Sequence, residues 1–174
     1  MSGSLVKINE AIVTTATPSV TLTGIDSTYD VYMVKLNNVV PVTDIQFLYF
    51  RVTVSGTPDI TANYDRAGKF LRTNSAFANQ SATNETQSWI EGTQIGNQTG
   101  EQLNSILYLF NFPNASEYSF LTRENTTLSY VPVASGSQGG TVHTVAQACD
   151  GIQFYFGSGD IDTGSKFTLY GLKK

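Results

Sequence analysis

Residues with reactive side chains are scarce in this chain, and their scarcity limits its possible chemistry. It has one histidine, His143, and one cysteine, Cys149. A structural zinc site needs about four nitrogen or sulfur ligands, and a serine or cysteine nucleophile needs an imidazole oriented by a third group. His143 lies in the alternating run Thr-Val-His-Thr-Val, which is typical of a strand. We therefore expect an ordinary strand histidine, and a structural Cys149 because no Lys, Arg or second His lies near it in sequence.

Paired carboxylates are the remaining catalytic candidates. The nearest pairs in sequence are Asp160 with Asp162 and Glu85 with Glu91. A glycan depolymerase would hold such a pair roughly 5 to 9 Å apart across a cleft. Asp160 and Asp162 are also typical of a turn, they lack the spacing of a calcium-binding EF-hand, and the chain has no phosphate-binding loop ending in Lys-Ser/Thr. We expect no catalytic residue, no metal site and no cofactor.

A polar segment, residues 74–104, indicates a binding function instead. It is rich in Asn, Gln, Ser and Thr and contains the single tryptophan. Sugar sites combine an aromatic ring, which packs on the C–H face of the sugar, with amide or carboxylate partners for the hydroxyls. Trp89 and Phe77 supply rings, and Asn84 and Asn97 supply amides. These four residues are the predicted ligand or receptor contacts; the alternative is a ring that only anchors its own loop.

Charge and composition argue against several partners. Ten basic and fourteen acidic residues give a net charge of −4 at pH 7, and no basic run exceeds Lys173-Lys174. We expect no nucleic-acid binding, because phosphate recognition needs concentrated Lys and Arg. No segment approaches about 18 consecutive apolar residues and the first residues do not resemble a signal peptide, so we expect a cytosolically made protein that does not insert into membranes. One cysteine allows no internal disulfide.

Strands must position whatever residues act. Charged residues are only 14% of the chain, whereas Thr, Ser and Asn occupy 50 of its 174 positions. Such residues favour strands, turns and loops over helix interiors. Apolar residues alternate with polar ones in short runs separated by turn residues. The pattern predicts one all-β domain over residues 1–174, an antiparallel sandwich or barrel of about ten strands with less than about a tenth of its residues in helix.

The apolar positions predict the core. Residues 45–54 form the clearest strand, apolar on one face, and residues 106–112 are apolar on both faces, which indicates a central or covered strand. The glycine-rich residues 135–140 are predicted as a turn between two strands, and residues 62–71 as holding at most one helical turn. The predicted core residues are Leu48, Phe50, Val52, Val54, Ile106, Tyr108, Phe110, Phe154, Phe167 and Leu169.

Several segments carry a resemblance to known proteins. They are residues 24–32 (GIDSTYDVY), 36–44 (LNNVVPVTD), 106–112 (ILYLFNF) and, most specifically, 151–172, which begins GIQFYFGSGDI and ends FTLYGL. They resemble virion structural proteins of tailed bacteriophages of the marine podovirus and cyanophage type, often described as fibre-like or tail-fibre-like. The resemblance implies a jelly-roll-like β-sandwich on the particle surface, and it brings no catalytic residue.

The leading hypothesis is a non-enzymatic virion surface protein, tail- or fibre-associated or a capsid decoration, made in the host bacterial cytoplasm. It would act by self-assembly and by docking onto other virion proteins. The symmetry of phage particles favours a homo-oligomer of threefold or higher order, with residues 1–17 as an assembly arm. One alternative is a host-receptor or glycan-binding module that uses residues 74–104. Another is a free β-sandwich of unknown use.

Overall fold

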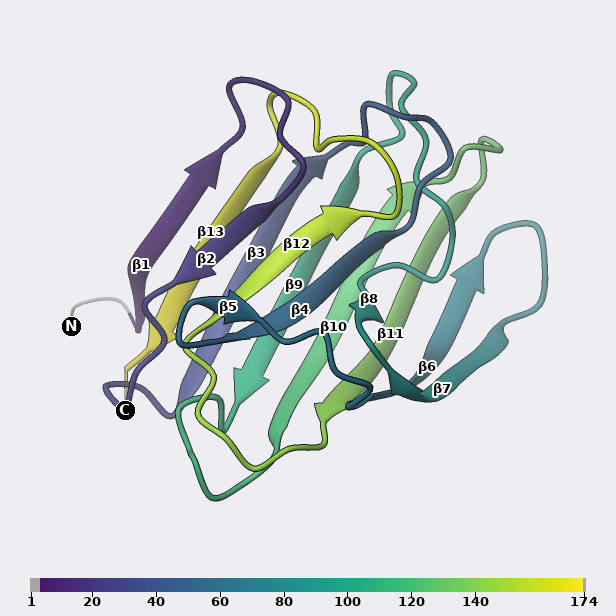
Figure 1. Cartoon of the computed structure of the whole chain (residues 1–174). Coiled ribbons are helices and arrows are strands. Elements are labelled where there is room, and N and C mark those ends of the chain that lie inside the picture. The colour runs from purple at the N-terminus through teal and green to yellow at the C-terminus, as the bar shows by residue number, and fades with distance from the viewer. Residues whose placement is uncertain (1–3, 174) are drawn as a thin grey trace.

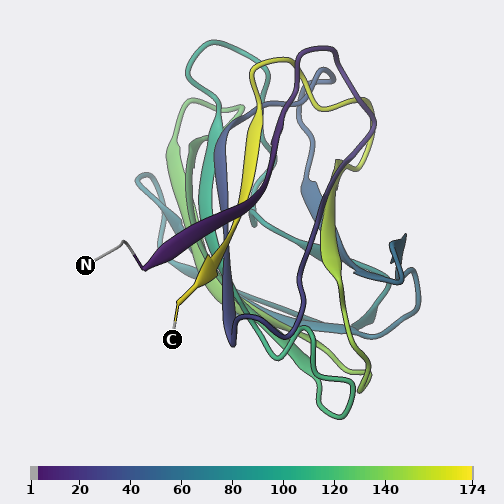
Figure 2. The same cartoon turned by 90° about the vertical axis from the view of Figure 1, so that its left-hand side faces the viewer.

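The computed structural model describes residues 4–173, so residues 1–3 of the predicted arm and Lys174 lie outside the described residues. This range contains thirteen strands and no helix. The strands form two antiparallel sheets packed face to face (Figures 1 and 2). The predicted antiparallel β-sandwich is therefore confirmed.

The larger sheet has eight strands and extends well beyond the smaller one. Its order is β1 (Leu5–Ile12), β13 (Lys166–Leu172), β3 (Val31–Val39), β9 (Leu103–Phe110), β10 (Ser119–Leu128), β11 (Ala134–His143), β6 (Tyr64–Arg72) and β7 (Ala78–Glu85). The smaller sheet has the order β2 (Val20–Thr23), β12 (Gly151–Phe156), β4 (Leu48–Val54) and β5 (Thr57–Pro58), and β8 (Ser88–Trp89) pairs with β4.

The hydrophobic core fills the space between the sheets. Six predicted core residues are buried there: Leu48, Phe50, Val52, Phe154, Phe167 and Leu169. Val54 and Phe110 are only half-buried. The prediction was wrong for Ile106 and Tyr108, which are 41% and 39% exposed. Strand β9 is apolar on both faces, so alternation alone could not decide between them, and the structure buries Leu103, Leu107 and Leu109 instead.

The glycine-rich residues 135–140 lie inside strand β11, and their prediction as a turn was wrong. The glycines are needed because β11 and β6 approach closely. A Cβ atom on Gly139 would lie 2.4 Å from the carbonyl oxygen of Ala67 and 2.7 Å from the Cα of Gly68. Residues 62–71, predicted to hold at most a helical turn, instead lie mostly in β6. Glycine inside a strand can mark such an approach of backbones rather than a turn.

The polar residues 74–104 contain strands as well as loops. The short strand predicted around Trp89 is present as β8, but β7 was not predicted. Strand β7 lies at the edge of the larger sheet and is largely exposed on both faces, so its sequence has no apolar alternation to reveal it. After β8 the chain crosses the inner side of β10 and β11, where Asn125 Nδ2 donates to the carbonyl oxygen of Ile90 and the hydroxyls of Ser88 and Thr141 lie 2.8 Å apart.

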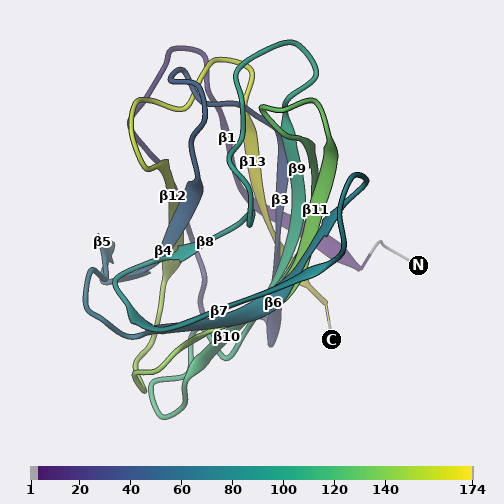
Figure 3. The ribbon, with the colours of Figure 1, turned by 90° about the vertical axis from the view of Figure 1, so that its right-hand side faces the viewer.

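Nothing in the part of the chain that the structure describes covers one face of the larger sheet (Figures 2 and 3). The smaller sheet and the segment around β8 both pack on its other face (Figures 2 and 3). We call the uncovered face the outer face. Ile106, Tyr108 and Phe120 are on this face, between 39% and 42% exposed.

Candidate functional site

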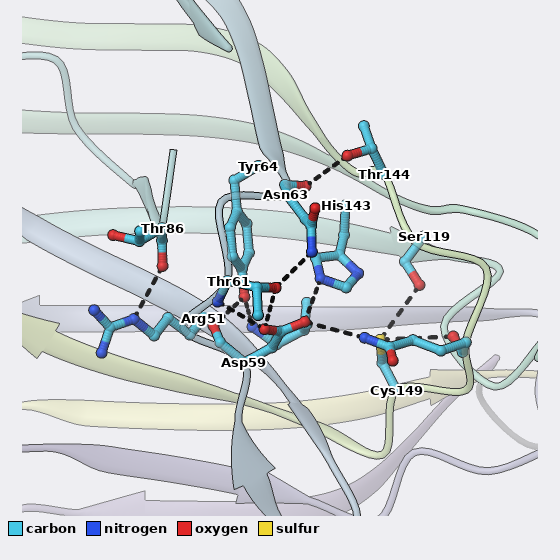
Figure 4. A network of polar contacts seen from close by, with 12 residues as sticks. Arg51, Asp59, Thr61, Asn63, Tyr64, Thr86, Ser119, His143, Thr144 and Cys149 are labelled. Atoms are coloured by element: carbon cyan, nitrogen blue, oxygen red, sulfur yellow. Dashed lines mark hydrogen bonds and ion pairs between the residues drawn. The ribbon is translucent and has the colours of Figure 1, made fainter. Parts of the chain in front are cut away.

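Asp59, in the loop between β5 and β6, is the centre of a hydrogen-bonded network (Figure 4). Its Oδ1 accepts a 2.8 Å hydrogen bond from the backbone N–H of Thr61. Its Oδ2 lies 2.9 Å from Nε2 of His143 and 3.1 Å from Nε2 of Gln147. The Tyr64 hydroxyl donates to the Asp59 carbonyl oxygen at 2.8 Å. Asp59 thus joins β11 and the loop that precedes β12 through its carboxylate, and β6 through its carbonyl oxygen.

The network sets the surroundings of both Asp59 and His143. Burial alone would raise the pKa of Asp59, but hydrogen bonds from Thr61 and then His143 outweigh it and hold that pKa below its ordinary value. The His143 side chain is 2% exposed, and its Nδ1 is buried without a hydrogen-bond partner among the described residues. His143 is therefore a buried strand histidine.

Ser119 and Cys149 complete this cluster. Ser119 lies opposite His143 across β10 and β11, and its hydroxyl donates to the Cys149 sulfur at 3.6 Å. Ser, His, Asp and Cys are the residue types of nucleophilic sites. Here, however, the serine hydroxyl is directed to sulfur and His143 Nε2 to Asp59, while burial raises the pKa of Cys149 to about 11. All three of Ser119, His143 and Cys149 are at most 2% exposed, so the arrangement fastens strands and presents no activated nucleophile to solvent.

The predicted carboxylate pairs occupy different settings. Oδ1 of Asp162 accepts a 2.7 Å hydrogen bond from the backbone N–H of Thr163, as in a turn. Asp160 contributes its carbonyl oxygen to the N–H of Val42. Glu85 is 44% exposed and lies 3.8 Å from Arg66, whereas Glu91 is fully buried. The two glutamates therefore do not share an open cleft.

Glu91 belongs to a buried charged cluster that the sequence did not reveal. Burial raises its pKa to about 7, against the opposing effect of the Gly92 N–H and the charge of Arg123. Arg123 is 2% exposed, and burial lowers its pKa to about 10. Arg123 Nε and Nη1 and Glu91 Oε2 lack hydrogen-bond partners within residues 4–173. Arg123 alternates with Leu121 on the inward face of β10, and this spacing was the available signal.

The four predicted binding residues come from separate elements. The Arg66 guanidinium lies 4.0 Å from the centre of the Trp89 ring, and the centres of the Phe47 and Trp89 rings are 5.3 Å apart. Trp89 therefore packs against other residues of the sandwich. Phe77 is 66% exposed, just before β7. The Asn84 N–H donates to Asp65. Asn97 donates from its side chain to the Val42 carbonyl oxygen at 3.0 Å, which fastens two loops. Ligand binding by these residues stays a prediction.

Three adjoining depressions lie on the outer face of the larger sheet. The largest, of about 520 Å³, crosses β10, β11, β6 and β7. It shares Thr122 with a second of about 320 Å³, which reaches Tyr108 on β9. The second shares Ile106 and Glu124 with a third of about 320 Å³ that extends to β3. This surface is the most extensive hollowed region that we find on the outer face.

Comparisons with protein-family models, curated proteins and solved structures return no match.

The described range has no helix that is long and apolar enough to cross a membrane. Within residues 4–173 no three His, Cys, Asp or Glu side chains gather in a way that could hold a metal ion. The proposals below therefore depend on the geometry of this chain and on the sequence resemblance described above.

Proposed function

We propose that the protein is a non-enzymatic structural component of a phage virion surface, tail- or fibre-associated or a capsid decoration, that assembles with copies of itself and docks onto other virion proteins. Jelly-roll-like connectivity is part of this proposal. The observation that carries it is the edge strand β1, which among residues 4–173 pairs with β13 alone and leaves Leu5 46% and Ile12 54% exposed. The segments that resemble phage structural proteins support the virion location.

An edge strand is a ready surface for pairing with another chain, because one row of its backbone groups has no partner in the sheet. The charges on β1 are compensated within the chain. Glu10 lies 3.2 Å from Lys7 and 3.0 Å from Lys166. An incoming chain would meet apolar Leu5 and Ile12 beside charges that already have partners. This supports an interface along the β1 edge.

The opposite edge of the same sheet suits a heterologous contact. Strand β7 has a single charged residue, Glu85, and otherwise Ala, Asn, Gln, Ser and Thr. An interface between two different edges repeats from copy to copy and forms a ring where the rotation between copies closes, or a filament where it does not, whereas an isologous interface stops at a dimer. Pairing of β1 from one copy with β7 of the next fits the expected threefold or higher order.

The test replaces side chains rather than deleting the arm. Residues 5–12 pair with β13, so deletion of residues 2–10 would remove part of the sandwich itself. The double variant Leu5→Lys with Ile12→Lys should be monomeric by light scattering and should still unfold in one cooperative thermal transition. Ile60→Lys is the matched control, because Ile60 is 63% exposed but lies outside β1. The wild type and this control should form oligomers of three or more copies.

A monomeric wild type, or oligomers that survive the double substitution, would overturn the proposed interface. The virion location has its own test, which is mass spectrometry of purified particles. The protein should be present at a copy number that matches a symmetric set of sites. Its absence from purified particles would refute the structural role.

A further inference from the structure

The outer face of the larger sheet contains a trough that runs across the strands. Its floor is one register row of small side chains, in which Thr122, Gly140, Ala67 and Ser81 follow one another on β10, β11, β6 and β7. The row has no side chain at all at Gly140. These residues line the depression of about 520 Å³. Its floor is low because this row lacks the large residues of its neighbours.

The neighbouring register rows flank this floor. The row of Phe120, Val142 and Asp65 forms one wall and lines the depression. On the other side is the row of Glu124, Gln138 and Lys69, of which Glu124 and Gln138 line the adjoining depression. Tyr108 lies beside Thr122 and stands at the β9 end of the trough. Adjacent strands are about 4.8 Å apart, so the four spacings from β9 to β7 give roughly 19 Å of length. The trough suits a narrow, extended ligand that lies across the strands.

The lining excludes two kinds of extended ligand. Strands β10, β11 and β6 each pair on both sides, so they offer no open edge to which a peptide could add as a further strand. The charged side chains of the two rows that flank the floor sum to zero. Asp65 and Glu124 are negative, whereas Lys69 and Lys35, which share the register row of Glu124, are positive. A nucleic acid or another polyanion would need a basic surface.

We propose that this trough binds a neutral polysaccharide, with consecutive pyranose rings lying end to end across β9, β10, β11, β6 and β7. The exposed rings of Phe120 and Tyr108 provide aromatic surface for the C–H faces of the sugars. The Thr122 and Ser81 hydroxyls, with carboxylate and amide groups in the rows that flank the floor, provide donors and acceptors for sugar hydroxyls. The depression is open rather than enclosed, so it suits such a ligand better than a lipid, which needs an enclosed apolar pocket.

This site differs from the glycan contacts predicted from the sequence. Those residues belong to the segment 74–104, in which Trp89 is packed under Arg66. The trough uses residues that were predicted as core or were not singled out. The trough ends on β7, the edge strand proposed to pair with β1 of the next copy, but Phe120, Thr122 and Gly140 lie on β10 and β11, away from both edges of the sheet. Failure of one proposal therefore leaves the other standing.

Affinity electrophoresis of the full chain tests the proposal. The gels contain neutral polysaccharides with glucose, galactose or mannose backbones, namely dextran, laminarin, a galactan and a galactomannan. Gels with alginate are the anionic control. The wild type should be retarded by at least one neutral polymer. Phe120→Ala should weaken the apparent affinity at least tenfold. Gly140→Val, which fills the floor, should do the same. Its Cβ would lie 3.3 Å from the nearest atom, the Leu121 carbonyl oxygen. Phe77→Ala is the matched aromatic control and should bind like the wild type.

Nuclear magnetic resonance gives a readout that needs no variant. Oligosaccharides of the retained polymer should shift the backbone amide signals of β10, β11 and β6 in the wild-type protein. Three results would overturn the proposal: no retardation by any neutral polymer, retardation by alginate alone, or binding that is lost in Phe77→Ala or Trp89→Ala and kept in Phe120→Ala. Particle incorporation of Phe120→Ala should be normal, which separates this test from that of the virion role.

Discussion

Replacing Glu91 by Gln should change how the stability of the protein depends on pH. The Glu91 carboxyl is fully buried, and burial raises its pKa from 4.5 to about 7. At pH below 4.5 it is protonated in both the folded and the unfolded chain and contributes nothing to the pH dependence. Between pH 4.5 and 7 the unfolded chain releases this proton while the folded chain retains it. The free energy of unfolding therefore falls as the pH rises through this window.

The size of the effect follows from the shift. Each unit of pKa difference corresponds to about 1.36 kcal/mol, so the full shift is worth about 3 kcal/mol. Above pH 7 both states are ionised and the loss is complete. Two other shifted groups act outside the window: the pKa of Asp59 is below its ordinary value, and that of Cys149 is about 11. Glu91→Gln has no proton to release at this position. The free energy of unfolding of the variant minus that of the wild type should therefore rise by about 3 kcal/mol from pH 4.5 to pH 7.5.

The assay is urea unfolding of wild type and variant at pH 4.5, 5.5, 6.5 and 7.5, which gives the free-energy difference at each pH. Taking this difference cancels other titrating groups that both proteins share. Glu117→Gln is the control, because it makes the same side-chain replacement at an exposed position. A Glu91→Gln difference that stays constant within about 0.5 kcal/mol over this range would refute the reasoning.

Three further predictions concern packing and reactivity. Leu107→Ala should cost about 2–5 kcal/mol of unfolding free energy and Ile106→Ala less than about 1 kcal/mol in chemical denaturation, since Leu107 is buried and Ile106 is on the outer face; equal losses would contradict the facing of β9. Gly139→Ala should cost at least about 1–3 kcal/mol, because its Cβ would meet backbone at 2.4 Å, and Gly140→Ala clearly less, by thermal unfolding. Cys149 should react with a disulfide reagent at pH 8 only after unfolding, because it is 1% exposed with a pKa of about 11; rapid reaction of the native protein would contradict this.

The fold class could be predicted because it depends on short-range pattern. The face formed by Leu48, Phe50 and Val52 alternates cleanly and is buried as expected. The facing of β9 could not be predicted, because both of its faces are apolar and only its pairing with β3 and β10 sets which one meets the smaller sheet. Strand β11 was missed for a related reason. Its glycines have the composition of a turn, and their purpose becomes visible only when β6 lies beside them.

The candidate sites depend on contacts that are distant in sequence. His143 was correctly predicted as a strand residue, but its partner Asp59 is 84 positions away and no local spacing relates the two. The trough on the outer face is likewise formed by residues that are far apart in the sequence. Its floor takes one small residue from each of four strands, and each residue alone is unremarkable in the sequence. Such rows appear only once the strand order and register are known.

The pairing of β1 with β13 has a consequence for how the chain acquires its structure. These are the first and last strands, and they lie side by side in the larger sheet (Figure 1). During synthesis β1 leaves the ribosome early but has no partner until residues 166–172 follow. Because β13 also separates β1 from β3, the sheet can become continuous only after translation of that last strand. Contacts between such distant segments fold slowly, so we expect a nascent chain that stays open until late and depends on the cell to protect it from aggregation.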